Sequence, residues 1–379
     1  MYQEFISFTK KTFNTEAFIP LHAPIFLGNE KKYLNECIDS TFVSSVGKFV
    51  DQFEADVAKF TGAKHAIATS NGTSALHIGL LMAGVSKEDE VITQPLTFIA
   101  TCNAISYIGA YPIFVDVDKE TLGLSPEKLE YFLVNNTEVI NGECINKSTK
   151  RKIKAVVPMH TFGFSANIEE LVSVCNRYNI KVVEDAAESL GSSYKGQHTG
   201  TYGLVGAFSF NGNKTITTGG GGMLITNDDA IAKKAKHITT TAKIPHPWDY
   251  EHDMIGFNYR LPNINAALGC AQLEKLPYIL ERKKVLSNKY DTFFKDKSIE
   301  YLRGPKDSNS NYWLNAVMLE NLEARNYFLK ETNEAGVMTR PIWKLMNTLT
   351  MFKNAQTGNL DNAEWFEDRI VNIPSSVII

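Results

Sequence analysis

The chain has few cysteines, no long apolar run and almost no net charge, and each shortage excludes a class of protein. Its five cysteines are odd in number and include no Cys-x-x-Cys pair, so neither a disulfide framework nor a thiolate metal site is indicated. No segment reaches the roughly 20 apolar residues that span a bilayer, and residues 1–18 carry charges where a secretory signal would be apolar. The net charge of −3 gives little support for nucleic-acid binding. We therefore expect a cytoplasmic protein with reduced thiols, no metal, no nucleic-acid partner and no membrane association.

Two nucleotide-binding motifs are also missing. Residues 209–214 nearly match a phosphate loop, but that motif needs glycine directly before its lysine, and Asn213 stands before Lys214. The four consecutive glycines at 219–222 precede a strand-like run, whereas a dinucleotide fingerprint follows a strand and opens a helix. The sequence therefore disfavours a phosphate-loop NTPase and a Rossmann dehydrogenase.

Short strand-like runs alternate with helical stretches, which predicts an α/β fold with a mostly parallel seven-stranded sheet flanked by helices. The runs lie at 66–69, 90–93, 111–115, 154–157, 181–184, 206–210 and 223–226. Residues 264–294 predict a long helix that connects to a smaller α+β domain. We expect a large domain at 1–250, including an N-terminal helical segment, and a small C-terminal domain at 251–379.

Lys214 is the first candidate for covalent chemistry. It follows the strand-like run 207–210 and precedes the glycines, and a lysine that attacks a carbonyl must be partly neutral, as in a buried and tightly turned pocket. A solvated lysine in a hairpin-like connection is the simpler interpretation of the same residues. Taken alone, Lys214 does not decide between them.

Asp185 is the second candidate, because it ends a buried strand-like run, where α/β proteins often place catalytic side chains. A helix N-cap is the alternative interpretation. A carboxylate that pairs with a pyridinium nitrogen is what pyridoxal phosphate chemistry requires, so Asp185 and Lys214 together suggest one cofactor.

A phosphate site is expected where a strand-like run at 66–69 leads through residues 70–74 into a helix. Helix N-termini bind phosphate through unpaired backbone N–H groups, and small hydroxyl residues add donors. Thr73 and Ser74 are therefore the expected phosphate contacts. Most turns of this kind hold no ligand. This one supports a phosphate site only in combination with Lys214 and Asp185.

From these motifs the chain resembles, over nearly its whole length, the DegT/DnrJ/EryC1/StrS sugar aminotransferases, which are fold-type I pyridoxal phosphate enzymes. The segments that carry the resemblance are Asn71-Gly72-Thr73, Gln94-Pro95-Leu96-Thr97-Phe98, Pro158-Met159-His160, Glu184-Asp185-Ala186-Ala187-Glu188, Ser209-Phe210 with Lys214 and the glycines, and Gly256-Phe257-Asn258-Tyr259-Arg260.

The resemblance implies that Lys214 forms a Schiff base with pyridoxal 5'-phosphate and then shuttles protons, while Asp185 keeps the pyridine nitrogen protonated. It implies that Phe98 stacks on the ring and that Glu188 lies near its phenolic oxygen. The residues that it assigns to the phosphate or its cradle are Gly72, Thr73, Ser74, Ser209 and, from the neighbouring subunit of a homodimer, Asn258.

Two positions depart from the commoner family pattern. Gly220 stands where many relatives have Glu, and a local effect on loop packing is expected. Glu188 stands where many relatives have Gln or His, and the resemblance links Glu here to amination at the sugar 4-position. Lys214 argues against the branch that carries His in its place and dehydrates sugars.

Three further residues are substrate candidates: His160, Tyr259 and Arg340. His160 either touches the cofactor or sugar, or is a hydrogen-bonded core histidine. Arg340 either pairs with a nucleotide diphosphate or is a surface arginine.

The sequence as a whole predicts a pyridoxal phosphate-dependent aminotransferase that uses L-glutamate and a nucleotide-linked 4-keto-6-deoxy sugar. UDP-4-keto-6-deoxy-N-acetylglucosamine is the leading acceptor, because the chain most resembles enzymes of legionaminic-acid-type and related diamino-sugar routes. Amination at the 3-position, a non-catalytic pyridoxal phosphate-binding regulator and a nucleotide-binding module without the cofactor are the alternatives; intact Lys214 and Asp185 weigh against the last two.

Overall fold

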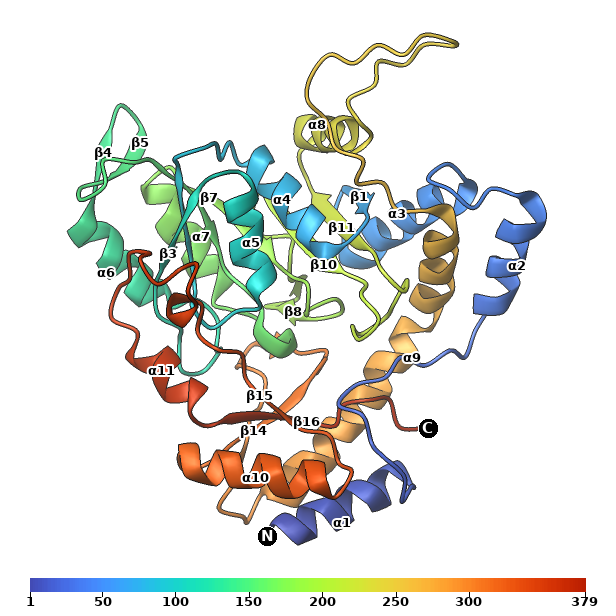
Figure 1. Cartoon of the computed structure of the whole chain (residues 1–379), viewed down its shortest axis with the longest axis vertical. Helices are drawn as coiled ribbons and strands as arrows, with labels where there is room; N and C mark the ends of the chain where they lie inside the picture. The colour runs from blue at the N-terminus through green and yellow to red at the C-terminus, as the bar shows by residue number, and fades with distance from the viewer.

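The computed structural model describes all residues 1–379 and shows a large sheet and a small sheet joined by one long helix (Figure 1). The helices are α1 (Tyr2–Phe13), α2 (Glu30–Ser40), α3 (Lys48–Thr61), α4 (Gly72–Met82), α5 (Ile99–Tyr107), α6 (Pro126–Asn136), α7 (Ile168–Arg177), α8 (Asp229–Thr239), α9 (Asn263–Phe294), α10 (Leu322–Glu334) and α11 (Asp361–Glu367). The large sheet contains β1 (His65–Thr69), β2 (Glu90–Thr93), β3 (Tyr111–Phe114), β6 (Ile153–Val157), β7 (Lys181–Asp185), β10 (Val205–Ser209) and β11 (Gly222–Thr226). The small sheet contains β12 (Glu300–Tyr301), β14 (Asn315–Met318), β15 (Arg340–Pro341) and β16 (Ile370–Ile373). The remaining strands are β4 (Thr137–Ile140), β5 (Glu143–Asn146), β8 (Ser193–Tyr194), β9 (Gln197–His198) and β13 (Ser308–Asn309).

The large sheet has the strand order β1-β11-β10-β7-β6-β2-β3 and is parallel except at β11, which is antiparallel to both of its neighbours. All seven strands coincide, within a residue or so at each end, with the seven predicted runs. The prediction of a mostly parallel seven-stranded α/β sheet is confirmed.

Both faces of this sheet are covered, as its mostly apolar and buried strands require. In β11, Met223 and Ile225 pack with α3 and α9, while Leu224, between them, packs with α4 and α8 on the other face. A one-residue shift of β11 would exchange these two sets of contacts.

The small sheet packs against the C-terminal half of α9, where Leu286, Tyr290 and Phe294 join Phe5 of α1 in one apolar cluster. The division at residue 250 stays a prediction. The N-terminal helix α1, which we expected within the large domain, lies beside α10 and the small sheet, because its apolar face enters that cluster (Figure 1).

Two segments extend from this body. Between α6 and β6, strands β4 and β5 form an antiparallel hairpin. After α8, the chain makes a projecting arm, residues 243–255, that carries exposed Trp248, Tyr250 and Ile255 (Figure 1). None of the helices combines the length and apolar character needed to cross a bilayer.

Candidate active site

The candidate site residues collect at one edge of the large sheet. The parallel strands β1, β2, β6, β7 and β10 all direct their carboxyl ends to this edge. β7 ends at Asp185 shortly before Glu188, and β10 ends at Ser209 shortly before Lys214. β1 leads through a short turn to Gly72, the first residue of α4. The topology therefore brings together residues that are far apart in the sequence.

Lys214 lies in the connection between β10 and β11, and its side chain is only 13% exposed. Its Nζ is 3.2 Å from Glu188 Oε1 and lies over the Trp313 ring, 3.8 Å from the ring centroid. The buried Trp313 donates its indole N–H to the carbonyl of Asn213 at 2.6 Å, which fixes the ring beside the lysine. Lys214 is therefore a largely buried lysine held by two partners and not a solvated surface lysine.

Glu188 is buried, and its two carboxylate oxygens have different partners. Oε1 faces Lys214, and Oε2 accepts the backbone N–H of Phe162 at 2.9 Å. Burial raises the pKa of Glu188 to about 7, while the positive charge of Lys214 opposes that rise. The carboxyl group can therefore gain or lose a proton near neutral pH, directly beside the candidate lysine.

Asp185 is almost fully buried, at 2% exposure. Its Oδ2 accepts the Thr101 hydroxyl at 2.6 Å, and its Oδ1 accepts the backbone N–H of Ala187 at 3.2 Å. Burial raises the pKa of Asp185, and these two hydrogen bonds oppose that rise. The aspartate caps a turn rather than a helix, because residues 186–191 form no helix.

The start of α4 is tightly packed and polar. Asn71 caps the helix by accepting the backbone N–H of Ser74 at 2.8 Å, and the hydroxyls of Ser70 and Ser74 lie 3.1 Å apart. A Cβ on Gly72, the first residue of α4, would lie 2.8 Å from Cβ of Ser209 at the end of β10. This close approach of α4 to β10 requires glycine. Hydroxyl groups and a helix N-terminus therefore converge next to β10.

Phe98 immediately precedes α5 and is 50% exposed, an unusual state for a phenylalanine within a large domain. Its carbonyl accepts the backbone N–H of Thr101, whose hydroxyl holds Asp185. The exposed ring of Phe98 thus precedes by about one helical turn the residue, Thr101, that hydrogen-bonds to Asp185.

These residues fit pyridoxal phosphate. A planar pyridine ring requires an aromatic face and a carboxylate for its nitrogen, and its phosphate requires hydroxyls and free amides of the kind found at the start of α4. Lys214 adds an amine within the same pocket. No group of three or more His, Cys, Asp or Glu side chains is arranged to hold a metal ion.

His160 is fully buried, and both of its ring nitrogens have protein partners. Nδ1 accepts the backbone N–H of Ala166 at 3.2 Å, so Nε2 carries the proton and donates to Glu184 Oε2 at 2.9 Å. Glu184 also accepts three backbone N–H groups, from Gly200, Tyr202 and Gly203. This geometry matches the core-histidine interpretation and leaves His160 no free polar atom for a substrate.

The other predicted residues make no hydrogen bond or ion pair with Lys214. Asn258 is exposed and accepts a hydrogen bond from Arg260. Tyr259 stacks on Phe257, and its hydroxyl is 3.2 Å from Nδ1 of His77. Arg340 is exposed on β15 and donates to Asn333 and to the Thr339 carbonyl, so no hydrogen bond or ion pair connects it with the lysine pocket.

Sequence reasoning missed several residues that shape the pocket. Thr101 holds Asp185, Trp313 supports Lys214, and Asn311 donates to the backbone carbonyl of Glu188 at 2.9 Å. Thr101 lies within the helix after Phe98, and its spacing from that residue could have indicated it. Asn311 and Trp313 belong to an irregular segment ahead of β14, and no pattern in the sequence marks them.

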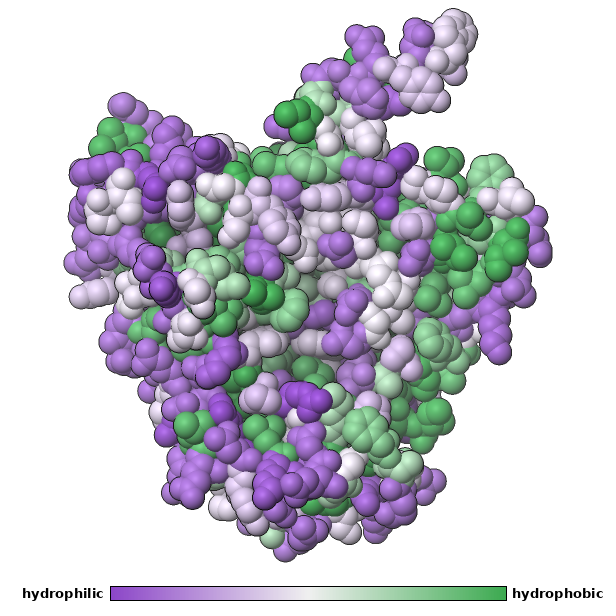
Figure 2. All heavy atoms as spheres, viewed as in Figure 1, coloured by the Kyte–Doolittle hydropathy of each residue, from purple (hydrophilic) through white to green (hydrophobic).

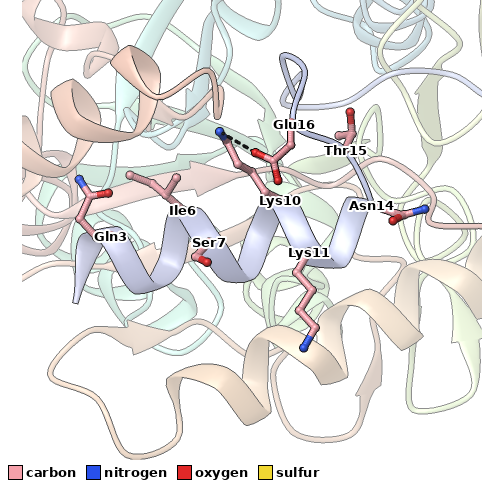
Figure 3. Close-up of a pocket in the computed structure, with 8 residues that line it drawn as sticks. All are labelled: Gln3, Ile6, Ser7, Lys10, Lys11, Asn14, Thr15 and Glu16. Carbon is pink, nitrogen blue, oxygen red and sulfur yellow. Dashed lines mark ion pairs between the residues drawn. The ribbon is translucent and has the colours of Figure 1, made fainter.

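A separate hollow lies on the outer face of α1, away from this edge (Figure 3). Lys10 and Glu16 form an ion pair across it, with 3.3 Å between Nζ and Oε2. Its lining residues are Gln3, Ile6, Ser7, Lys10, Lys11, Asn14, Thr15 and Glu16. None of them hydrogen-bonds to the residues around Lys214, so the hollow is not part of the candidate site.

Several known proteins are similar to this chain in sequence or in fold. The model of the DegT/DnrJ/EryC1/StrS aminotransferase family matches residues 26–378. GDP-perosamine synthase of Escherichia coli O157:H7 is 37% identical over 360 residues, covering 94% of this chain and 93% of that protein. GDP-perosamine synthase of Caulobacter vibrioides is 36% identical over 361 residues, with coverages of 94% and 93%. The structure of Helicobacter pylori PseC, an aminotransferase involved in the biosynthesis of pseudoaminic acid, has a TM-score of 0.84 at 25% identity and covers 94% of this chain and 93% of its own.

The fold and the lysine–carboxylate pocket define a pyridoxal phosphate-dependent transferase, and the chain belongs to the DegT/DnrJ/EryC1/StrS aminotransferase family. It is a sugar aminotransferase with pyridoxal 5'-phosphate as its cofactor.

Proposed function

We propose that this sugar aminotransferase moves the amino group of L-glutamate to the 4-keto group of a nucleotide-linked 4-keto-6-deoxy sugar. The observation that carries the proposal is the position of the Lys214 amine, held between Glu188 and the Trp313 ring in the pocket that contains Asp185. A fixed position assists an amine that must exchange protons with two successive substrates, and a carboxyl beside it can take part in that exchange.

Pyridoxal phosphate, when bound, supplies a conjugated ring that accepts the electrons released as a carbon–hydrogen bond breaks. In this proposal the Asp185 carboxylate holds a proton on the ring nitrogen, and Phe98 covers one face of the ring. The phosphate is held by Thr73, Ser74 and Ser209 together with the first turn of α4, where Gly72 permits close packing.

In the first half-reaction the Lys214 amine would take a proton from the donor's Cα and deliver it to the cofactor, and in the second it would move a proton from the aminated cofactor to carbon 4 of the sugar. Glu188 Oε1, 3.2 Å from that amine, is placed to accept and return its proton, and burial keeps its pKa near the range where both states are populated. Trp313 limits the amine to one side of the pocket.

The nucleotide has two candidates. The sequence resemblance favours UDP-4-keto-6-deoxy-N-acetylglucosamine. A GDP-linked sugar is the second candidate, because relatives with 36–37% identity over more than nine-tenths of this chain are named GDP-perosamine synthase. For either nucleotide, the proposal that the amine is added at carbon 4 rests on the resemblance at Glu188. Arg340 and Tyr259 remain proposed substrate contacts.

We also propose that the enzyme works as a homodimer. Figure 2 shows hydrophobic side chains gathered over α2 and the loop that follows it, a surface that a monomer would leave in water. The exposed apolar residues of this region are Phe26, Leu27, Ile38, Phe42, Val43 and Val46. Asn258 follows the projecting arm and is exposed, as expected of a residue that completes a partner's phosphate site.

An absorbance spectrum with and without L-glutamate tests the first half-reaction. The enzyme reconstituted with pyridoxal phosphate should show a visible absorbance band that glutamate converts to the near-ultraviolet band of the amino form. Lys214→Ala should show no such conversion, whereas Lys353→Ala, at an exposed lysine, should behave as the wild type. If the reconstituted enzyme shows no cofactor band, the proposal is wrong.

Product analysis tests the second half-reaction. The amino form of the enzyme should aminate either UDP-4-keto-6-deoxy-N-acetylglucosamine or a GDP-linked 4-keto-6-deoxy sugar, and NMR should place the new amine at carbon 4. A strong preference for the GDP sugar would exclude the first candidate. An amine at carbon 3 would contradict both.

A further inference from the structure

Lys283 is a fully buried lysine that has no carboxylate partner. It lies in the C-terminal half of α9 with 0% exposure. Its Nζ has three polar neighbours: the Ser375 carbonyl at 2.7 Å, His22 Nε2 at 3.0 Å and the Trp313 carbonyl at 3.2 Å. Lysine is seldom fully buried unless it is paired with a carboxylate, so these three neighbours are the reason to look for a role.

Lys283 is the hydrogen-bond donor to both backbone carbonyls, because a carbonyl oxygen can only accept. Burial lowers the pKa of Lys283 to about 7, and the neutral amine still has two N–H bonds, one for each carbonyl. The contact with Trp313 can therefore persist on either side of neutral pH. No other hydrogen bond reaches either carbonyl, so an apolar side chain at this position would leave both of them without a donor.

Trp313 lies between Lys283 and the lysine of the candidate site. Its carbonyl accepts the hydrogen bond from Lys283, and its indole N–H is donated to the Asn213 carbonyl at 2.6 Å. Nζ of Lys214 lies over its ring, 3.8 Å from the ring centroid. The two lysines therefore contact the same tryptophan, one at its backbone and the other at its ring.

The backbone of Trp313 depends on side chains for its position. Residues 311–313 belong to no helix or strand, so no ladder of backbone hydrogen bonds holds them. The Trp313 backbone makes two hydrogen bonds: its N–H is donated to Asn311 Oδ1 at 2.8 Å, and its carbonyl accepts from Lys283. The first bond is local, since it spans two residues. The bond from Lys283 is therefore the only one that connects the Trp313 backbone to another element of the fold.

We propose that Lys283 is a positioning residue for Lys214 and acts on it through Trp313. Lys283 fixes the Trp313 backbone to α9, whose C-terminal half is packed into the apolar cluster of the small sheet. The ring of Trp313, held in this way, limits where the Lys214 amine can lie. The inference rests on the proposed role of Lys214 in amino transfer, and it adds a residue that touches neither the lysine nor a substrate.

A purely structural role is the alternative, because Lys283 also joins α9 to the N-terminal and C-terminal segments of the chain. Tyr290 offers the matched control. It is a fully buried residue of the same helix, and its hydroxyl donates to the Pro374 carbonyl at 2.9 Å, one residue before the terminal carbonyl that Lys283 binds. Tyr290→Phe therefore removes a bond from α9 to the same terminal segment and leaves the hydrogen bonds of Trp313 intact.

Lys283→Met keeps the length of the side chain and removes its N–H donors. The single-turnover rates with L-glutamate and with the nucleotide sugar should both fall about tenfold per cofactor-loaded site, because the Lys214 amine acts in both half-reactions. The substrate concentrations for half-maximal rate should change less than about twofold. Lys283→Arg, which keeps N–H donors, should recover most of the rate, and Tyr290→Phe should match the wild type.

Three kinetic results would overturn the inference. They are rates in Lys283→Met within about threefold of the wild type, an equal loss in Tyr290→Phe, and an equal loss in Lys283→Met and Lys283→Arg. If Lys283→Met does not fold, Lys283→Gln takes its place. Its amide is one atom closer to the backbone, so an intermediate loss is expected, and wild-type rates would contradict the inference.

Fluorine-19 NMR of protein labelled with 5-fluorotryptophan gives a readout that needs neither cofactor nor turnover. The chain has four tryptophans, and the signal of Trp313 is the one that Trp313→Phe removes. Lys283→Met should shift or broaden this signal, whereas Tyr290→Phe should leave it in place. An unchanged Trp313 signal in Lys283→Met would sink the inference. If the signal responds as expected but Lys214→Ala keeps wild-type turnover, the proposed role of Lys214 is wrong and the link from Lys283 to Trp313 stands.

Discussion

The ammonium of Lys214 lies 3.8 Å from the centroid of the Trp313 ring. The two residues come from different parts of the fold: Lys214 from the β10–β11 connection of the large sheet, and Trp313 from the segment that enters the small sheet. The aromatic face holds the amine by a cation–π contact, and the indole N–H bond to Asn213 holds the ring. The segment that leads into the small sheet therefore contributes directly to the position of the reactive lysine.

Substitutions of Trp313 should separate these two effects. Trp313→Phe keeps an aromatic face but loses one hydrogen bond, so we expect turnover within about threefold and a loss of about 1 kcal/mol of stability. Trp313→Leu also removes the face, and turnover should fall by about tenfold or more because the amine loses its fixed position. Steady-state kinetics and thermal unfolding measure the two quantities. Trp365→Leu, at a largely exposed tryptophan, is the control, and equal turnover in the two Trp313 variants would contradict this account.

Thr101→Val should impair the enzyme mainly at acidic pH. The Thr101 hydroxyl opposes the burial that raises the pKa of Asp185, so its removal raises that pKa further. The carboxylate then becomes protonated at a higher pH, and turnover on the acid side should fall about tenfold below that of the wild type. The pH–rate profile measures this. Ser106→Ala, in the same helix but bonded only to the Cys102 carbonyl, should leave the profile unchanged.

Glu188→Gln should change how stability depends on pH. The folded-state pKa of Glu188 is raised from 4.5 to about 7, so the stability from its protonation is fully present below pH 4.5 and lost as pH rises through 7. The glutamine variant lacks this loss, so its stability relative to the wild type should increase across that window by on the order of 3 kcal/mol. Urea unfolding of the cofactor-free protein at several pH values measures the difference. Glu169→Gln, at an exposed glutamate, should show no such trend.

His160→Leu should lower stability without changing substrate affinity. It leaves Glu184 buried with one hydrogen bond fewer, at a cost of about 1–3 kcal/mol. His160→Gln keeps a donor and should cost less. Chemical unfolding and the KM values for glutamate and the nucleotide sugar give the test. A large rise in either KM without a loss of stability would show that His160 contacts substrate after all.

The sequence predicted the large sheet well because its strands are short apolar runs bounded by polar residues, a local property. It also assigned Asp185 and Lys214 to one cofactor, and both follow the carboxyl ends of parallel strands at one edge of the sheet. The antiparallel position of β11 was not predicted, since it depends on how the β10–β11 connection folds back.

The supporting residues of the pocket could not be predicted in the same way. Thr101 is 84 residues from Asp185, Trp313 is 100 residues from Asn213, and His22 is 261 residues from Lys283. Each contact exists only after the chain has packed, and no periodicity marks these positions. Lys283 lies among the four charged residues 281–284, and it is the one that is fully buried.

The 32-residue helix α9 also has a mechanical consequence. Its first half packs against α3 beside the large sheet, and its second half forms part of the small domain's core. The large and the small sheet therefore share this helix, and any movement of one sheet relative to the other would bend it. Pro277 lies near the middle of α9 and has no backbone N–H to donate within the helix. The helix therefore bends most easily at this residue.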